Sequence, residues 1–216
     1  TPLIAIVGYS ELLENDAGLS LEAEQKQEYL SIIQSNAEIL NRLVDDLLDV
    51  GRIQIGRSLG VVLKEAQLSE VIEKVVGSLR VKNELHRITV VHTNPLPEIG
   101  WFDPGRITQV LYNLLSNALK YSPQGGKIEI RTTSAPGTGS VAVVDQGQGM
   151  SPALVENVFD RFYRGEDVDA ETHGLGLGMG IVKQIIEDHG GEIVVKSRLG
   201  EGTKVTFTLP LKPERA

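Results

Sequence analysis

Six apolar residues recur along one stretch of the chain with the alternating spacing of a heptad. They follow one another at intervals of 3, 4, 3, 4 and 3 positions: Leu30, Ile33, Ala37, Leu40, Val44 and Leu47. This spacing predicts a long helix whose apolar seam packs against other helices. A second apolar edge, formed by Ile32, Ile39, Leu43 and Val50, runs beside the seam. One short partner helix cannot cover both edges.

Residues 1–56 are therefore predicted to form an antiparallel helical hairpin. The first helix extends to about Asn15, and Ser20 is a candidate N-cap for a second helix that begins near Leu21. Two hairpins together can bury both apolar edges as a four-helix bundle, so we expect a homodimer through residues 1–56. The alternative is a hairpin that packs on the remainder of its own chain. Pro2 lies inside the first apolar pattern with no cap before it, so we expect that helix to begin upstream of Thr1.

Composition excludes several classes of partner. The net charge is −8 and no basic run occurs, which argues against a nucleic-acid surface. The absence of cysteine excludes disulfides and thiolate metal sites and suits a reducing, cytoplasmic environment. No apolar run approaches the roughly 20 residues of a membrane span. We therefore expect contact with a membrane only through regions that precede Thr1.

The spacing of apolar residues changes in the second part of the chain, where short alternating segments appear beside helical ones. An α+β fold is therefore predicted overall. Residues 57–65 are expected to be a linker, with a hinge in the stretch GRIQIGRSLG, and residues 66–216 a separate domain. Asp103 and Pro104 are typical of an N-cap and a first helical position. Short alternating segments form hairpins with helices inserted between them, which predicts a mixed sheet with helices on one face, a two-layer α/β sandwich.

Two carboxamides lie four positions apart in the segment QVLYNLLSNALKYS. This spacing places Asn113 and Asn117 on one face of a helix that ends in Lys120 and Tyr121. Amide oxygens followed by a cation can hold a hydrated magnesium ion and phosphates, because magnesium keeps several waters and takes few protein ligands. Taken alone, the pattern fits an ordinary solvated polar face better.

A carboxylate follows the apolar run VAVV and precedes two glycines. Asp145 at the end of a strand can accept a hydrogen bond from an exocyclic amine, while Gly147 and Gly149 allow the backbone to approach a flat ring. An ordinary strand-to-loop turn is the alternative.

A glycine run opens the last helix. Gly174, Gly176 and Gly178 lie at its start, and glycine-rich backbone at a helix N-terminus can bind an anion. A polar segment before the run is typical of a mobile lid, although the glycines can also be a simple hinge. Thr203, in the later GEGT stretch, can close the site or belong to a hairpin loop.

The order of these four stretches on one β/α scaffold resembles the catalytic half of sensor histidine kinases. The stretches are similar to the N box and the three glycine boxes of that GHKL-type ATPase family, and FDRFYR, residues 159–164, is similar to its F box. The helical hairpin resembles the family's dimerisation and phosphotransfer domain. The resemblance covers nearly the whole chain.

The resemblance implies ATP and Mg²⁺ as cofactors and a role for each matching residue. Asn117 would coordinate magnesium with Asn113 nearby, Lys120 would contact phosphate, and Asp145 would read adenine. Arg164 would be a ligand of the γ-phosphate. The remaining expected nucleotide contacts are Tyr121, Gly147, Gly149, Phe159, Gly174, Leu175, Gly176, Leu177, Gly178 and Thr203.

The implied reaction is transfer of the ATP γ-phosphate to a histidine and then to an aspartate of a response regulator. In gyrase and other ATP-hydrolysing relatives a glutamate four residues before the magnesium Asn activates water. Asn113 occupies that position here, and an amide cannot act as a base. The resemblance therefore favours phosphotransfer over hydrolysis, with positioning and charge neutralisation as the protein's contribution.

The family's phosphoacceptor motif, His-Glu-x-x-Thr/Asn-Pro-Leu, matches this chain only from Thr1 onward. The acceptor histidine is expected four residues before Thr1, and Thr1 matches a position that helps to dephosphorylate the regulator. His86, His92, His173 and His189 lie outside the hairpin and are expected to be structural or surface residues. These 216 residues are thus expected to bind ATP without autophosphorylation. A non-catalytic, nucleotide-gated dimeric scaffold is the alternative.

Overall fold

The computed structural model describes residues 2–15, 21–80, 85–94, 100–122, 125–160, 163 and 176–210. The chain divides into two compact units, Thr1–Gly51 and Arg52–Ala216. Within the described ranges no helix is both long and apolar enough to cross a membrane.

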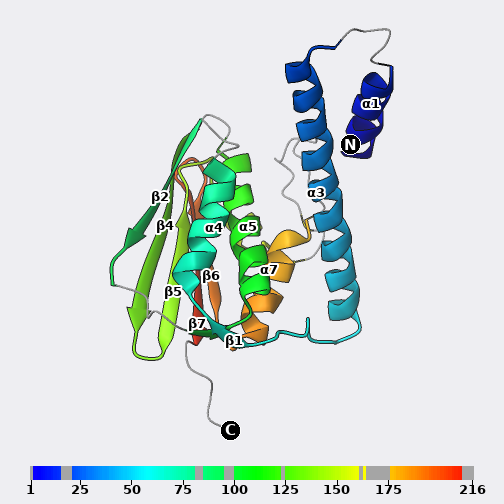
Figure 1. Cartoon of the computed structure of the whole chain (residues 1–216). Helices are drawn as coiled ribbons and strands as arrows, with labels where there is room; N and C mark the ends of the chain where they lie inside the picture. The colour runs from blue at the N-terminus through cyan, green and yellow to red at the C-terminus, as the bar shows by residue number, and fades with distance from the viewer. Residues whose placement is uncertain are drawn as a thin grey trace. The chain divides into compact units, whose positions relative to one another are not determined.

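The first unit is a pair of helices, α1 (Pro2–Glu14) and α3 (Ala23–Gln54), of which the last three residues of α3 belong to the second unit. The rings of Tyr9 and Tyr29 pack with centroids 5.1 Å apart, which joins α1 to the first part of α3. Figure 1 shows α1 beside this part of α3. The expected N-cap, Ser20, lies outside the described residues. Gln25 instead accepts a hydrogen bond from the backbone N of Glu22 at 3.0 Å, as the third residue does in a capping box.

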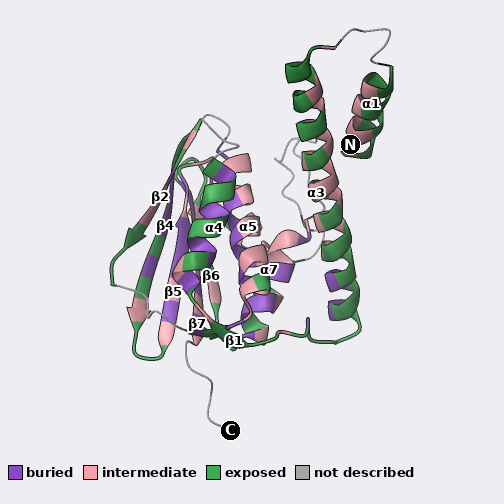
Figure 2. Ribbon diagram, in the orientation of Figure 1, coloured by how far each residue is buried: buried purple, intermediate pink, exposed green. Residues whose placement is uncertain are grey.

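Little of this unit is buried. Among its described residues only Asp49 and Val50 are buried, and no residue of α1 is (Figure 2). Three members of the heptad seam are exposed: Leu30 by 51%, Val44 by 55% and Leu47 by 60%. On α1 the exposed apolar residues are Leu3, Ile4, Val7 and Leu12. One hairpin thus leaves much of its apolar surface uncovered.

The second unit is built on a five-stranded mixed sheet of order β2-β4-β5-β7-β6. Only the β2–β4 pair is parallel, and the other neighbours are antiparallel. The five strands are β2 (His86–His92), β4 (Gly126–Ala135), β5 (Thr138–Val144), β6 (Ile193–Arg198) and β7 (Gly202–Pro210). A separate antiparallel pair joins β1 (Lys64–Ala66) to β3 (Gly100–Phe102).

Helices α4 (Leu68–Arg80), α5 (Pro104–Lys120) and α7 (Gly178–Asp188) cover one face of the sheet, and a short helix, α6 (Pro152–Glu156), precedes α7 (Figure 1). The apolar stripes of the three long helices meet alternate residues of the strands, such as Ile128 and Ile130, both fully buried. The predicted α+β fold, with helical N-terminus and helices on one face of a mixed sheet, is confirmed.

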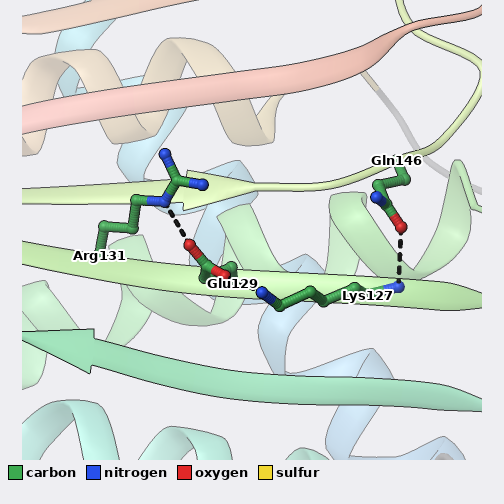
Figure 3. Close-up of polar contacts among 4 residues, drawn as sticks. All are labelled: Lys127, Glu129, Arg131 and Gln146. Atoms are coloured by element: carbon green, nitrogen blue, oxygen red, sulfur yellow. Dashed lines mark hydrogen bonds and ion pairs between the residues drawn. The ribbon is translucent and has the colours of Figure 1, made fainter.

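The other face of the sheet carries charge. Lys127, Glu129 and Arg131 alternate with the buried isoleucines of β4, and Glu129 forms ion pairs with both cations (Figure 3). The hydrogen bonds from Lys127 and then Arg131 lower the pKa of Glu129. The backbone N of Lys127 also donates to Oε1 of Gln146 at 3.4 Å.

Two expected boundaries differ from the structure. The first residues of the expected hinge, Gly51 to Gln54, are helical because α3 continues through them. The stretch expected as a linker ends in strand β1, whose pairing with β3 depends on residues about 36 positions away and left no local signal. By contrast, Asp103 caps α5 through Gly105 N and Arg106 N, with Pro104 in the first turn, as predicted.

Candidate nucleotide-binding site

Helix α5 carries both expected carboxamides, and Asn113 lies against the start of α7. Asn113, Asn117 and Lys120 all lie on α5, and Ile107, Leu111 and other apolar residues hold its opposite side in the core. A Cβ built on Gly178 would lie 3.6 Å from the amide of Asn113. The Nδ2 atom of Asn113 is buried and has no hydrogen-bond partner among the described residues. A buried amide without a partner is costly, so this atom is available to a ligand oxygen.

In the described part of the chain the N-terminus of α7 has no side-chain cap. Leu177 is its N-cap residue and forms no side-chain capping bond, and Gly176 adopts φ +69° just before it. The first N–H groups of a helix have no partner within the helix, and together with the helix dipole they favour an anion. Gly178 lacks a side chain where the helix passes Asn113. Backbone N–H groups and the Asn113 amide therefore meet at one place.

Asp145 stands at the end of β5 and is 8% exposed. Its Oδ1 accepts hydrogen bonds from Gly147 N at 2.9 Å and Thr203 N at 3.2 Å. Burial raises the pKa of Asp145, although these two hydrogen bonds act in the opposite direction. No described residue donates to Oδ2, so this oxygen can accept from a bound group.

Glycines allow three backbone segments to meet beside this carboxylate. A Cβ on Gly147 would lie 2.7 Å from Ser122 Oγ and would overlap the carbonyl oxygen of Tyr121. A Cβ on Gly149, which has φ +68°, would overlap the carbonyl oxygen of Arg198. The backbone N of Gln148 donates to Tyr121 O at 3.0 Å. The end of α5, the loop after β5 and the β6–β7 turn are thus held together by contacts that only glycine permits.

The remaining described candidates lie around these segments. Tyr121 is the C-cap of α5, and its ring lies 4.9 Å from Nζ of Lys120. The ring of Phe159 lies 5.5 Å from Nζ of Lys183 on α7. The Thr203 hydroxyl hydrogen-bonds to Ser197 Oγ at 2.9 Å. Thr1, Arg164, Gly174 and Leu175 lie outside the described residues.

Sequence reasoning missed two polar residues next to the site. Ser122 is 4% exposed, lies against Gly147, and its Oγ has no partner among the described residues. Ser197 donates to Gly202 O at 2.8 Å and pairs with Thr203 across the β6–β7 hairpin. The position of Ser122 directly after Tyr121 was an available signal, whereas that of Ser197 follows only from strand register.

A metal would find few protein ligands here. In the described part of the chain no three residues of the types His, Cys, Asp and Glu are grouped to hold an ion. Asn113 and Asn117 provide amide oxygens on one face of α5. This donor set fits Mg²⁺ held mainly by phosphates and water, and it does not fit a closed structural metal site.

Comparisons with known proteins match both parts of the chain to known families. Residues 102–213 match the family described as histidine kinase-, DNA gyrase B- and HSP90-like ATPase, and residues 1–56 match the His Kinase A (phospho-acceptor) domain. The sensor protein SrrB of Staphylococcus aureus (strain MRSA252) is 34% identical over 218 residues, covering 99% of this chain and 36% of that protein.

Two solved structures are similar along the chain. A mycobacterial sensor histidine kinase, MprB, is 30% identical with a TM-score of 0.61 over 71% of this chain and 100% of its own. Full-length ShkA in complex with AMPPNP is 27% identical with a TM-score of 0.70, covering 100% of this chain and 44% of ShkA. The present chain spans about a third of the length of the SrrB relatives. It belongs to the family of histidine kinase-, DNA gyrase B- and HSP90-like ATPases and is the core of a sensor histidine kinase.

Proposed function

We propose that the second unit binds Mg²⁺–ATP and transfers its γ-phosphate to a histidine that is expected four residues before Thr1. In this proposal residues 1–56 form the dimerisation and phosphotransfer domain, residues 57–65 connect the two parts, and residues 66–216 form the ATP-binding domain. An aspartate of a response regulator would then receive the phosphate. The histidine kinase family and the AMPPNP complex of ShkA support nucleotide binding here.

The observation that carries the proposal is the environment of Asp145. Its Oδ1 is held by two backbone N–H groups while Oδ2 accepts no hydrogen bond from the described residues. Such a carboxylate is fixed in position through one oxygen, and its other oxygen can accept a hydrogen bond from the exocyclic amine of adenine. Gly147 and Gly149 let the loop after β5 pack closely beside this carboxylate, because side chains there would overlap neighbouring carbonyls. A donor on Oδ2 would also offset the burial that raises the pKa of this carboxyl.

The phosphates would lie between α5 and α7. Asn113, Asn117 and Lys120 would face them from α5, with the N–H groups that follow Leu177 opposite. Mg²⁺, bound by Asn117 with Asn113 nearby, would neutralise phosphate charge. Arg164 would contact the γ-phosphate, and Gly174, Leu175, Gly176 and Leu177 would frame a lid.

The proposed transfer breaks the bond between the γ-phosphorus and the bridging β–γ oxygen. A new bond forms from that phosphorus to an imidazole nitrogen, and ADP leaves with the bridging oxygen. The chain's own groups hold and neutralise the phosphates. Asn113 stands where hydrolysing relatives carry a general base, and its amide cannot take a proton from water. The proposal therefore favours transfer to histidine over steady ATP hydrolysis.

The uncovered seam of the first unit supports a homodimer through residues 1–56. Leu30, Val44 and Leu47 are more than half exposed within one hairpin, and a second hairpin in a four-helix bundle would bury them. The same bundle would present the phosphohistidine to the response regulator, with Thr1 in a dephosphorylating role.

Asn117→Ala tests the nucleotide site. We expect Mg²⁺-dependent ATP affinity, measured by isothermal titration calorimetry, to fall at least about 100-fold because a ligand of the metal is lost. The far-UV circular dichroism and thermal unfolding should change little. Asn36→Ala is the matched control, since Asn36 also lies on a helix and its Nδ2 donates to Ile32 O at 2.8 Å, outside the site.

Unchanged ATP affinity in Asn117→Ala would show that the site is misplaced. A version extended upstream separates the remaining alternatives when it is given labelled ATP. Acid-labile phosphate on a histidine supports the kinase. ATP binding without phosphate on the protein supports a non-catalytic scaffold, and steady release of inorganic phosphate without an acceptor supports a hydrolase. These 216 residues alone are expected to bind ATP without becoming phosphorylated.

A further inference from the structure

The end of α3 is closed by a complete C-terminal cap. Gly56, at φ +68°, donates from its backbone N to Ile53 O at 3.1 Å, and Arg57 N donates to Arg52 O at 3.0 Å. These two bonds are the pair that defines a Schellman motif. The chain that leaves α3 therefore has a fixed direction as far as Arg57.

The next residues are bound by a carboxylate at the end of α7. Oδ2 of Asp188 accepts from the hydroxyl of Ser58 at 2.9 Å and from the backbone N of Leu59 at 2.8 Å. Gln184, one turn earlier on α7, donates to Oδ1 at 2.9 Å and fixes the carboxylate. The carbonyl oxygen of Leu59 accepts from Nη2 of Arg106 at 3.1 Å. The Leu59 side chain is 2% exposed, so this attachment also has an apolar anchor.

A second carboxylate holds the segment three residues later. Oδ1 of Asp103 caps α5, while its Oδ2 accepts from the backbone N of Val62 at 3.0 Å. The backbone N of Asp103 donates to Nε2 of His189, directly after α7, at 3.0 Å. Strand β1 begins at Lys64 and pairs with β3. Residues 58–62, here called the strap, thus bind the start of α5 and the end of α7.

We propose that Asp188 and Asp103 are positioning residues, and that the strap they hold fixes the last turn of α3 to the two helices that carry the nucleotide site. Asn113, Asn117 and Lys120 lie on α5, and Gly178 begins α7 about 15 Å from Asp188. The hydrogen bond from Arg106 to the carbonyl oxygen of Leu59 adds a third direct link between the strap's backbone and these helices. The part of this inference that concerns phosphoryl transfer rests on the proposed function.

Release of the strap would leave residues 58–63 free between the cap of α3 and strand β1. Six extended residues span up to about 20 Å. In-line transfer needs the reacting atoms roughly 3–3.5 Å apart, so such freedom would lower the effective concentration of the acceptor without altering the ATP site. The expected signature is a lower turnover at an unchanged KM for ATP.

Hydrogen exchange tests whether the strap is held, in the chain as it stands. Asp188→Ala should raise the exchange rate of the Leu59 amide at least about tenfold, because its acceptor is removed. Ser58→Ala, which keeps the Leu59 bond, should have a smaller effect on the same amide. Glu187→Ala is the matched control: it removes a neighbouring exposed charge whose ion pair is with Lys183, and it should leave Leu59 exchange within about twofold of the parent. An unchanged exchange rate of the Leu59 amide in Asp188→Ala would show that Asp188 does not hold the strap.

Kinetics test the positioning role in the protein extended upstream to include the expected histidine. Asp188→Ala should lower the single-turnover autophosphorylation rate at saturating ATP at least about fivefold, with the KM for ATP within twofold. Glu187→Ala should match the parent. A normal rate in Asp188→Ala, or a fall caused by a raised KM, would overturn the positioning role. An unphosphorylated parent would refute the proposed function and the positioning role together, while the exchange result would still decide whether the strap exists.

Discussion

The two units of this chain differ in charge and in burial. The first 51 residues contain ten acidic and two basic residues, which accounts for the whole net charge of −8 and leaves nineteen of each sign to the second unit. The second unit contains most of the buried apolar residues, whereas the described part of the first unit has two buried residues. The second unit thus has its own core, while one hairpin buries little of its apolar surface.

Glycine substitutions should reveal the largest difference in stability between the two units. Gly149→Ala should lower the free energy of unfolding of the second unit by at least ~3 kcal/mol, because the new Cβ would overlap Arg198 O at a positive φ. Gly51→Ala, in α3 with nothing within 4 Å, should stabilise the hairpin by about 1 kcal/mol. Urea unfolding followed by Trp101 fluorescence and by circular dichroism measures both. Equal changes in the free energy of unfolding of the two units would contradict the difference in packing between them.

A substitution in the exposed apolar seam of α3 should have the next largest effect, on dimer formation. Leu47→Glu places a charge where a second hairpin is expected, so the dimer Kd from sedimentation equilibrium should rise at least about tenfold. Leu47 is 60% exposed within one hairpin.

Leu199→Glu is the matched control, because Leu199 is 68% exposed in the turn between β6 and β7. Its dimer Kd should stay unchanged. If the parent sediments as a monomer at tens of micromolar, the homodimer is wrong and the hairpin must be covered in another way.

The pH dependence of the free energy of unfolding should distinguish the units most finely, since all four histidines lie in the second one. Burial lowers the pKa of His189 below 6.5, against the opposing hydrogen bond to Ile185 O and the charges of Asp103 and Asp188. Below pH 6.5 the unfolded chain then binds more protons than the folded one. The free energy of unfolding of the second unit should therefore be constant above that pH and fall as the pH decreases from 6.5 toward the folded pKa.

Thermal or urea unfolding between pH 5.5 and 7.5 measures this slope. Nε2 of His189 accepts from Asp103 N, and a proton there would remove the acceptor. His189→Gln should unfold more easily at every pH but with a flatter dependence. An unaltered slope would assign the effect to another group, and a comparable slope in α3 helicity would contradict the assignment to the second unit.

Local chemistry explains what the sequence predicted well. Asp103 followed by Pro104 specifies a helix start through short-range bonds, and the result is the observed cap of α5. Ser151 and Pro152 begin α6 in the same way, with the Ser151 side chain accepting from Leu154 N. The glycines of the proposed site were recognisable because their motifs have fixed spacing.

Long-range pairing explains what it did not predict. Asp188 serves the strap only because the fold brings residues about 130 positions apart within hydrogen-bond distance. Strand β1 exists only through its pairing with β3. Ser197 reaches Thr203 through strand register. None of these residues carries a local pattern that differs from an ordinary loop, helix end or strand.

The parallel pairing of β2 with β4 has a consequence for the order of folding. The chain between these strands includes β3 and the whole of α5, so the strands can join only after the helix has crossed the sheet. Such pairings close long loops and form late. Helix α5, which carries Asn113, Asn117 and Lys120, is part of this connection. We therefore expect the proposed nucleotide site to form in the same slow folding step that pairs β2 with β4.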